Sequence, residues 1–442
     1  MRDALPVDRS ESAFADLKLP LLPDAAVVEA NRCLFCSDAP CTKACPTHID
    51  VPQFIRKIAT GNLRGSARTI FEANVLGMSC ARVCPVEVLC VGACVYNDLE
   101  QPPIAIGRLQ RHATDAAYAA GWRFFEPGPP TGRRVALLGA GPASLAAAHE
   151  LRRLGHGCTI LEKREVVGGL NTTGVAPYKM KAEQALDEAA WILSIGGIEV
   201  RLGVEVGVDV PLAALERDFD AVFVGVGLGA DGRLGIPGES LDGVHGAVEW
   251  IERMKLGRHD LSQVRHAVVV GGGNTAIDAV REARGLGLGR VTMLYRGSPD
   301  AMGGYAHEWR AALAEGVRAE WRAVATAFEP APGSSRVARV QAVHVDAARR
   351  PVDGSAFALD ADLVLLAIGQ ARLGELLGGL AGIVLDHGRI ATDADGFTGR
   401  RGWYAGGDCA NGGREVVYAA AEGKRAARAI DRDLGEGRSL RA

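Results

Sequence analysis

The feature that most constrains this chain is a group of cysteines near its N-terminus. Eight of the ten cysteines fall between residues 33 and 94 of a 442-residue sequence, and two of them are followed directly by proline. Thiolates a few residues apart, with a proline after the last cysteine of a run, are the usual ligands of cubane iron–sulfur clusters. The pattern therefore predicts two [4Fe–4S] clusters in this part of the chain. The eight cysteines are Cys33, Cys36, Cys41, Cys45, Cys80, Cys84, Cys90 and Cys94.

Two other readings of the cysteines fit less well. A disulfide framework requires an oxidising compartment, but the chain opens without a signal-peptide pattern and is much longer than a small secreted scaffold. Structural zinc sites use paired Cys-x2-Cys units, and only Cys33 and Cys36 have that spacing. Zinc remains the main alternative to iron–sulfur clusters.

Composition narrows the class of protein. Fifty-six glycines and 48% hydrophobic residues with only 5% aromatic residues are typical of an α/β protein with many strand-to-helix turns. A net charge of −3 without a basic block gives no reason to expect nucleic acid as a partner. No apolar run approaches the length of a membrane span. Many cysteines without a secretory signal favour a reducing compartment, so we expect a cytoplasmic protein that contacts no membrane.

The N-terminal part is predicted to be helical. Between the two cysteine groups, apolar residues recur at helical spacing over residues 51–76, with breaks near Gly61 and Gly65. Two helices joined by a turn would bring the cysteine groups together. A further helical pattern covers residues 104–124, and a Pro/Gly-rich linker follows at residues 126–133. We therefore place an all-helical cluster domain at residues 1–127.

A complete dinucleotide fingerprint begins after the linker. A short strand at residues 134–138 leads into a glycine turn and a helix, and the next strand ends on Glu162. Gly139 permits the tight turn, Gly141 lets the backbone approach a pyrophosphate, and Glu162 is placed to bind a ribose hydroxyl. The helix N-terminus would face the phosphate charge. The third small position holds Ser144 where Gly or Ala is usual, which should loosen helix–strand packing slightly.

A second fingerprint follows, with its glycine turn at residues 271–276 and its next strand ending on Arg296. An arginine at this strand end favours a 2′-phosphate and therefore NADP over NAD. The alternative is a solvent-facing arginine, since the next residue is Gly297 instead of a second arginine. The choice between NADH and NADPH stays open.

The repeated strand–glycine pattern predicts two similar nucleotide-binding units, one inserted in the other. Two further strands, at residues 220–227 and 362–370, have similar glycine-containing ends, and a late strand closes on Gly406-Gly407-Asp408 before a final helix. The fold class is therefore α/β, with two Rossmann-like domains after the helical domain. The outer domain would comprise residues 128–243 and 371–442, and the inserted domain residues 244–370.

Together, these motifs resemble a known family. The two fingerprints and the late Gly-Gly-Asp are similar to two-dinucleotide flavoproteins. The preceding cysteines make the chain resemble the small, FAD- and iron–sulfur-containing subunit of NAD(P)-dependent dihydropyrimidine dehydrogenases, whose family includes the glutamate synthase small subunit. The resemblance covers about residues 31–434. It implies that NADH or NADPH is oxidised through FAD and that electrons pass singly through two [4Fe–4S] clusters to a partner.

The resemblance implies specific cofactor contacts. Those for FAD are Gly139, Gly141, Pro142, Ala143, Ser144, Glu162, Lys163, Gly169, Leu170, Gly407, Asp408, Val416 and Val417. Those for NAD(P)H are Gly271, Gly273, Asn274, Thr275 and Arg296. No catalytic acid or base is expected because the cofactors carry the chemistry. Glu308 is expected to be an ordinary helix-surface acid, with a nicotinamide contact as the alternative. A redox disulfide is not expected from the two remaining cysteines, Cys158 and Cys409.

The resemblance also implies the cluster ligands. The first cluster would take Cys33, Cys36, Cys41 and Cys94, and the second Cys45, Cys84, Cys90 and Gln110. Cys80 would then bind no iron, although by spacing alone it is an equally good ligand. The alternative for Gln110 is an exposed helix residue. Glutamate synthase relatives tend to carry an acid at this position, so the glutamine favours the dihydropyrimidine dehydrogenase branch.

The expected partner is a separate catalytic subunit. The chain has no room after the flavin domain for an FMN-binding barrel, so such a barrel, with its own iron–sulfur clusters, would reduce uracil or thymine to dihydropyrimidines within a hetero-oligomer. The alternatives are the same electron-input role in glutamate synthase, a stand-alone NAD(P)H:acceptor oxidoreductase, and a non-enzymatic module with structural zinc.

Overall fold

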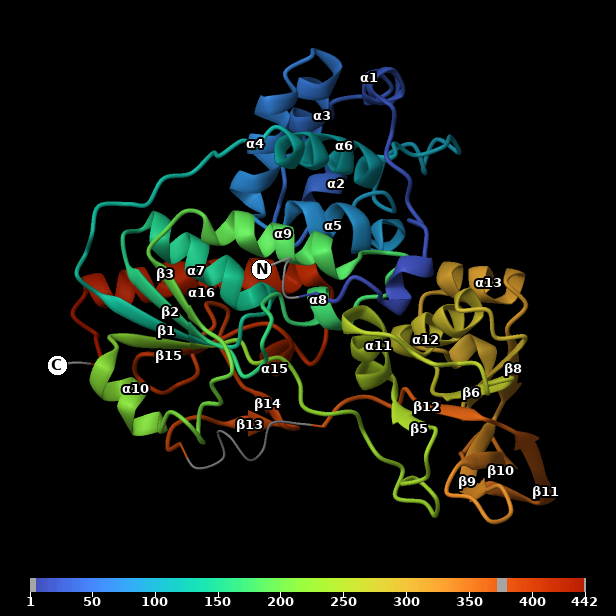
Figure 1. Cartoon of the computed structure of the whole chain (residues 1–442). Helices are drawn as coiled ribbons and strands as arrows, with labels where there is room; N and C mark the ends of the chain where they lie inside the picture. The colour runs from blue at the N-terminus through green and yellow to red at the C-terminus, as the bar shows by residue number, and fades with distance from the viewer. Residues whose placement is uncertain (1–4, 372–379, 441–442) are drawn as a thin grey trace.

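The computed structural model describes residues 5–371 and 380–440, and its first part is helical (Figure 1). Within residues 5–127 the regular elements are all helices. They are η2 (Ser10–Ala13), α1 (Pro23–Asn31), α2 (Pro40–Lys43), α3 (Val51–Ala59), α4 (Leu63–Ala73), α5 (Gly77–Val83), η3 (Val86–Val88) and α6 (Ile106–Ala119). Residues 126–133, predicted as a linker, form neither helix nor strand. Across the described residues, no helix combines the length and apolarity needed to cross a bilayer.

The pair α3 and α4 forms as predicted, with one difference. The Asp50 carboxylate caps α3 by accepting a hydrogen bond from the Gln53 amide at 3.1 Å. The side chain of Asn62 caps α4 by accepting from the Gly65 amide at 2.9 Å. Gly65, predicted as a break, therefore lies in the first turn of α4, because the Asn62 cap starts the helix before it.

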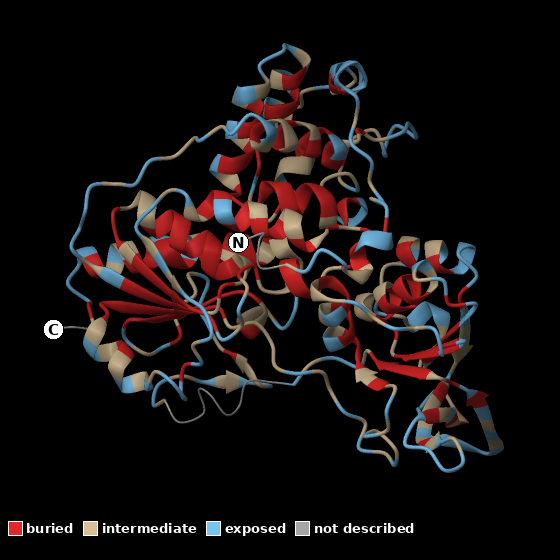
Figure 2. Cartoon of the chain, in the orientation of Figure 1, coloured by how far each residue is buried: buried red, intermediate tan, exposed pale blue. Residues whose placement is uncertain are grey.

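The first parallel sheet has the order β15-β4-β1-β2-β3; its strands are mostly buried except for the edge strand β3, whose residues are partly or fully exposed (Figure 2). They are β1 (Arg134–Leu138), β2 (Gly157–Leu161), β3 (Ile198–Arg201), β4 (Ala221–Val224) and β15 (Trp403–Ala405). The helices of this unit are α7 (Pro142–Arg153), α8 (Leu170–Thr173), α9 (Ala182–Leu193), α10 (Leu212–Asp218), α15 (Asp408–Asn411) and α16 (Val416–Gly435). The short antiparallel pair β13 (Leu385–Asp386) and β14 (Arg389–Ile390) also belongs to its chain segment.

The second parallel sheet has the order β5-β12-β6-β7-β8. Its strands are β5 (Val244–Gly246), β6 (His266–Val270), β7 (Arg290–Tyr295), β8 (Arg318–Trp321) and β12 (Leu363–Leu366), and its helices are α11 (Ala247–Leu256), α12 (Asn274–Gly285), η4 (Pro299–Ala301) and α13 (Ala306–Ala314). All of these strands lie in the chain between β4 and β15, so one unit is inserted in the other, as predicted. Residues 372–379 lie outside the described residues.

The sequence did not indicate the antiparallel sheet that extends the second unit. It consists of β9 (Ala323–Pro330), β10 (Val337–Val345) and β11 (Pro351–Asp360), in the order β11-β10-β9. Most of β11 is exposed, so its residues show no continuous apolar pattern that would have predicted a strand.

The helical domain shares a hydrophobic core with the first sheet (Figure 1). Phe71 of α4 packs on Trp191 of α9 with ring centroids 4.5 Å apart, and the Trp191 indole donates to the Trp122 carbonyl at 2.9 Å. This continuity holds the cysteines at a defined place beside the first unit.

The N-terminal arm packs against all three parts of the molecule. The Ser10 amide donates to the Gly257 carbonyl at 2.9 Å in the second unit, and the Leu17 amide donates to the Tyr178 carbonyl at 2.7 Å in the first. The Lys18 ammonium donates to the Cys84 carbonyl at 2.9 Å in the helical domain. The described residues of the arm therefore pack against the rest of the molecule.

Candidate functional site

One group of four cysteines lines a single pocket in the helical domain. Cys33, Cys36, Cys41 and Cys94 share this pocket, whose remaining lining is aliphatic, proline or tyrosine. The pKa of the Cys41 thiol is raised to about 11, mainly by burial and to a smaller extent by the nearby Cys33 and Cys94 thiols. The fold thus brings the last cysteine of the sequence group to the first three.

A second group forms around the end of α5. Burial raises the pKa of the Cys90 thiol, and the next largest contributions come from Cys84 and Cys45, so these three thiols are neighbours. Cys80 lies beside Cys84, is fully buried, and accepts a hydrogen bond from the Asn74 side-chain amide at 3.1 Å. The structure therefore places Cys80 near the second group as well.

The thiols are unpaired and lie apart from one another. All ten cysteines, each of which lies in the described residues, are free thiols. Within residues 5–371 and 380–440, no three His, Cys, Asp or Glu side chains converge on one point. In a [4Fe–4S] cluster the thiolates are spread in this way, because each thiolate binds a different iron atom.

Gln110 is buried, so the alternative of an exposed helix residue is wrong. Its side chain is 7% exposed on α6. Its Nε2 donates a hydrogen bond to the Gly77 carbonyl at the start of α5, at 2.8 Å. This contact occupies the nitrogen end of the amide and leaves Oε1 as the atom that could bind a metal.

Two glycine turns meet at the N-terminus of α7. Gly139 has φ +86°, and a Cβ there would lie 2.7 Å from the Gly225 carbonyl oxygen. A Cβ on Gly169 would lie 2.8 Å from the Cα of Gly141. Side chains at these positions would fill the space beside the helix N-terminus. The turn therefore has the form that accepts a pyrophosphate.

Glu162 lies beside this turn and is almost fully buried. Its Oε2 accepts from the Ala140 amide at 2.7 Å and its Oε1 accepts from the Arg164 amide at 2.8 Å. These bonds orient the carboxylate and leave lone pairs for ribose hydroxyls. The neighbouring Lys163 is exposed. Ser144 is fully buried on α7 and faces Gly225.

The C-terminal residues join the same site. Gly407, with φ +77°, approaches Ala143, since a Cβ there would lie 3.0 Å from the Ala143 Cβ. Burial raises the pKa of the half-buried Asp408 to about 6, and the charges of Glu422 and Glu415 add to the rise. The other predicted FAD contacts lie at helix N-termini: Pro142 and Ala143 begin α7, Leu170 begins α8, and Val416 and Val417 begin α16.

The second fingerprint has the same form. Gly271 has φ +143°, and a Cβ there would lie 2.2 Å from the Ala367 carbonyl oxygen. Gly273 precedes α12, and no atom would lie within 4 Å of a Cβ added to it. Thr275 is half-buried, and Arg296 is exposed at the end of β7 with no ion pair to another described residue. This arrangement leaves the Arg296 guanidinium free for a ligand.

Sequence reasoning missed the contacts of Tyr305 and Glu308. The Tyr305 amide donates to Asn274 Oδ1 within the second unit at 2.9 Å, and the Tyr305 hydroxyl donates to Glu415, which precedes α16 in the first unit. Glu308 is buried and pairs with the Lys179 ammonium at 2.9 Å, so its expected place on a helix surface is wrong. No local pattern could have found these contacts, because each partner comes from a distant part of the chain.

Two family profiles match the chain. Residues 9–122 match "Dihydropyrimidine dehydrogenase domain II, 4Fe-4S cluster", and residues 133–423 match "Pyridine nucleotide-disulphide oxidoreductase". Together the matches cover the helical domain and both nucleotide units.

Curated relatives are similar over nearly the whole chain. The putative oxidoreductase AegA of Escherichia coli K12 is 35% identical over 98% of this chain and 69% of its own length. The NAD-dependent dihydropyrimidine dehydrogenase subunit PreT of Salmonella typhimurium is 35% identical over 94% and 95%. The glutamate synthase [NADPH] small chain of E. coli K12 is 34% identical over 94% and 93%.

Solved structures share the fold of the nucleotide units. FprA from Mycobacterium tuberculosis, determined with NADPH, matches with a TM-score of 0.56 at 21% identity, covering 70% of this chain and 86% of FprA. The thioredoxin reductase of T. acidophilum matches with a TM-score of 0.54 at 21% identity, covering 68% and 99%.

Proposed function

Because the chain belongs to the pyridine nucleotide-disulphide oxidoreductase family and carries a dihydropyrimidine dehydrogenase-type 4Fe-4S domain, we propose that it delivers electrons from NAD(P)H to a pyrimidine-reducing partner. The chain is an NAD(P)H-dependent oxidoreductase, an electron-transfer subunit with FAD and [4Fe–4S] cofactors. The observation that supports electron transfer between flavin and clusters is the shared core, which contains cysteines of the helical domain together with residues of the FAD-type fingerprint.

We assign the helical cluster domain to residues 1–127, the FAD domain to residues 128–243 and 371–442, and the NAD(P)H domain to residues 244–370. FAD would lie along the facing glycine turns, with Glu162 at its ribose and Asp408 at its ribityl or phosphate part. The N-termini of α7 and α16 would face its negative charge. NAD(P)H would lie on the turn at residues 271–276, with Arg296 at its ribose end.

Two clusters would be held by seven thiolates and one amide. The pocket lined by Cys33, Cys36, Cys41 and Cys94 would hold the first. Cys45, Cys84, Cys90 and Gln110 would hold the second. The hydrogen bond from Gln110 Nε2 to Gly77 supports this choice, since it leaves the amide oxygen available.

When bound, NAD(P)H supplies a hydride, FAD accepts it and the clusters carry single electrons. The residues of the chain provide position and electrostatics. Tyr305 links Asn274 in one nucleotide unit to Glu415 in the other and so holds the two sites in register. The apolar lining of the first cysteine pocket lowers the polarity around its half-buried thiols. No side chain is assigned as a catalytic acid or base.

The proposed partner is a separate FMN-binding barrel subunit with its own iron–sulfur clusters that reduces uracil or thymine, in a cytoplasmic hetero-oligomer. The relatives named as dihydropyrimidine dehydrogenase subunits support this, as does the glutamine at position 110. The second candidate is the electron-input role in glutamate synthase, supported by the relative of nearly equal identity. A stand-alone NAD(P)H:acceptor reductase is the third.

The test is anaerobic purification of the native complex and identification of the partner by mass spectrometry. An FMN barrel subunit that turns over pyrimidines supports the proposal, and a large amidotransferase subunit refutes it. The chain alone should contain about eight irons, as the two four-iron clusters require, and one flavin, and should bleach with NAD(P)H without pyrimidine turnover. Zinc without the broad iron–sulfur absorption would refute the cluster assignment.

Paired variants test the second cluster. Gln110→Ala should alter the spectrum of one cluster and leave the other unchanged, whereas the matched Cys80→Ser should leave both unchanged. The reverse result would make Cys80 the ligand and Gln110 a structural residue.

A further inference from the structure

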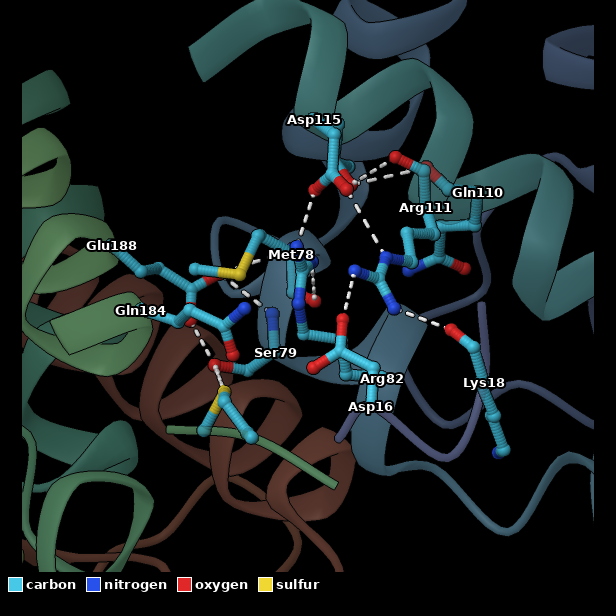
Figure 3. Close-up of polar contacts among 12 residues, drawn as sticks. Asp16, Lys18, Met78, Ser79, Arg82, Gln110, Arg111, Asp115, Gln184 and Glu188 are labelled. Carbon is cyan, nitrogen blue, oxygen red and sulfur yellow. Dashed lines mark hydrogen bonds and ion pairs between the residues drawn. The ribbon is translucent and has the colours of Figure 1, made fainter. Parts of the chain in front are cut away.

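A buried carboxylate lies between the flavin-side unit and the cluster domain. Glu188 of α9 is 1% exposed and points at the start of α5 (Figure 3). Its Oε1 accepts hydrogen bonds from the Met78 and Ser79 amides, both at 3.0 Å, and its Oε2 accepts from the Ser79 hydroxyl. One side chain from the flavin-side unit therefore binds the helix that leads to Cys84.

The Gly77–Met78 peptide group connects Glu188 to Gln110. The Met78 N–H and the Gly77 carbonyl belong to the same peptide group. That carbonyl accepts the 2.8 Å hydrogen bond from Gln110 Nε2. The Glu188 carboxylate, the Gly77–Met78 peptide and the Gln110 amide thus form one continuous hydrogen-bonded series.

The other end of the series reaches the glycine turn assigned to FAD. Asn171 Nδ2 donates to the Ser79 hydroxyl at 3.0 Å. Asn171 belongs to α8, and Gly169 is the residue that immediately precedes this helix. The hydrogen-bonded contacts therefore extend from the flavin turn through Ser79 and Glu188 to Gln110.

We propose that Glu188 is a positioning residue that orients the Gln110 amide and strengthens its oxygen as an iron ligand through the Gly77–Met78 peptide. The inference rests on the proposed ligation of iron by Gln110. Hydrogen bonds in a series polarise one another at low dielectric, so a carboxylate at one end increases the negative charge on the Gly77 carbonyl oxygen. The Gln110 N–H then donates more strongly, and its oxygen gains electron density.

A simpler role for Glu188 would be to cap α5, and the two roles predict different results. Glu188→Gln removes the charge but keeps the shape: its oxygen can accept from both amides and its nitrogen can donate to the Ser79 hydroxyl. Gln110→Glu keeps an oxygen for iron but offers no N–H to Gly77. Ser79→Ala removes the hydroxyl contact and leaves the Met78 amide in place.

The experiment is an EPR-monitored redox titration of the anaerobically purified holoprotein, at a pH above the raised pKa of Glu188, which burial moves to about 7. Glu188→Gln should raise the midpoint potential of the second cluster, because less electron density at the ligand favours the reduced form. In the Gln110→Glu background the same substitution should shift the potential little or not at all. Ser79→Ala should leave the potential unchanged.

Three results would overturn the inference. An equal shift in both backgrounds would mean that the charge acts through space. No shift in either would leave Glu188 as a cap, and its effect would then appear only in the unfolding temperature. If Gln110→Glu left the second cluster's spectrum and potential unaltered, Gln110 would not be a ligand. Iron content and bleaching by NAD(P)H test the proposed function separately, so a failure of the proposed role of Glu188 can be distinguished from a failure of that function.

Discussion

The contact between α16 and α7 depends on a glycine, and its replacement gives a sharp test of the FAD site. An ideal Cβ on Gly423 would lie 2.1 Å from the Ala143 carbonyl oxygen and 2.9 Å from its carbonyl carbon. Both distances are shorter than a methyl group can approach, and both atoms are backbone. Gly423→Ala must therefore push α16 away from the first turn of α7.

The size of the effect follows from two opposing contributions. Alanine in place of glycine inside a helix favours folding by about 1 kcal/mol. Insertion of a methyl group into a close-packed contact costs about 1–3 kcal/mol. Gly435, at the exposed end of the same helix, has no atom within 4 Å of an added Cβ, so Gly435→Ala serves as the matched control without a clash. We expect Gly423→Ala to be less stable than Gly435→Ala by about 1–3 kcal/mol.

The assay is the temperature at which FAD fluorescence is released from each holoprotein, together with FAD content after gel filtration. A difference of this size should lower the release temperature by about 2–4 °C for each kcal/mol in a unit of this size. FAD content should fall for Gly423→Ala, because the displaced turn at Ala143 belongs to the proposed pyrophosphate site. Equal release temperatures and full FAD content in both variants would refute this account of the helix contact.

Three further predictions concern single side chains. The pKa of His149 is lowered to about 3, mainly by burial and also by Arg153 and Lys424, so the unfolded chain binds the proton more tightly than the folded chain. The free energy of unfolding should therefore decrease as the pH falls below about 6.5, by about 1.4 kcal/mol per pH unit. His149→Phe should flatten this slope in urea unfolding at pH 7 and pH 5, and an unchanged slope would contradict the assignment. Lys255 is fully buried and donates to the Val175 and Met180 carbonyls of the neighbouring unit at 2.7 and 2.8 Å. Lys255→Met would leave these carbonyls without a donor, so it should lower the free energy of unfolding, measured by urea titration, by about 1–3 kcal/mol. Arg296→Ala should raise KM for NADPH by about 10- to 150-fold, because a charged hydrogen bond of about 1.5–3 kcal/mol is lost, and should leave KM for NADH unchanged. Equal changes in KM for both nucleotides would place Arg296 away from the 2′-phosphate.

Local patterns predicted most of the nucleotide units correctly. The strand of residues 134–138, the glycine turn after it and the helix that follows appear where the sequence placed them. A turn such as Gly139 depends on backbone angles that few other residues adopt, so it is visible in the sequence. The sheet of β9–β11 was not predicted, because most residues of its outer strand are exposed and form no run of apolar residues.

The sequence by itself determined that this chain has a group of closely spaced thiols and two glycine turns for dinucleotides, since both depend on neighbours a few residues apart. Only the tertiary structure decided which thiols share a pocket, that Gln110 is buried with its nitrogen on Gly77, and that Glu188 reaches the same peptide from the flavin-side unit. Burial and hydrogen-bond partners between distant residues arise when the helical domain and the first sheet form one core. The spacing of residues along the sequence does not indicate that contact.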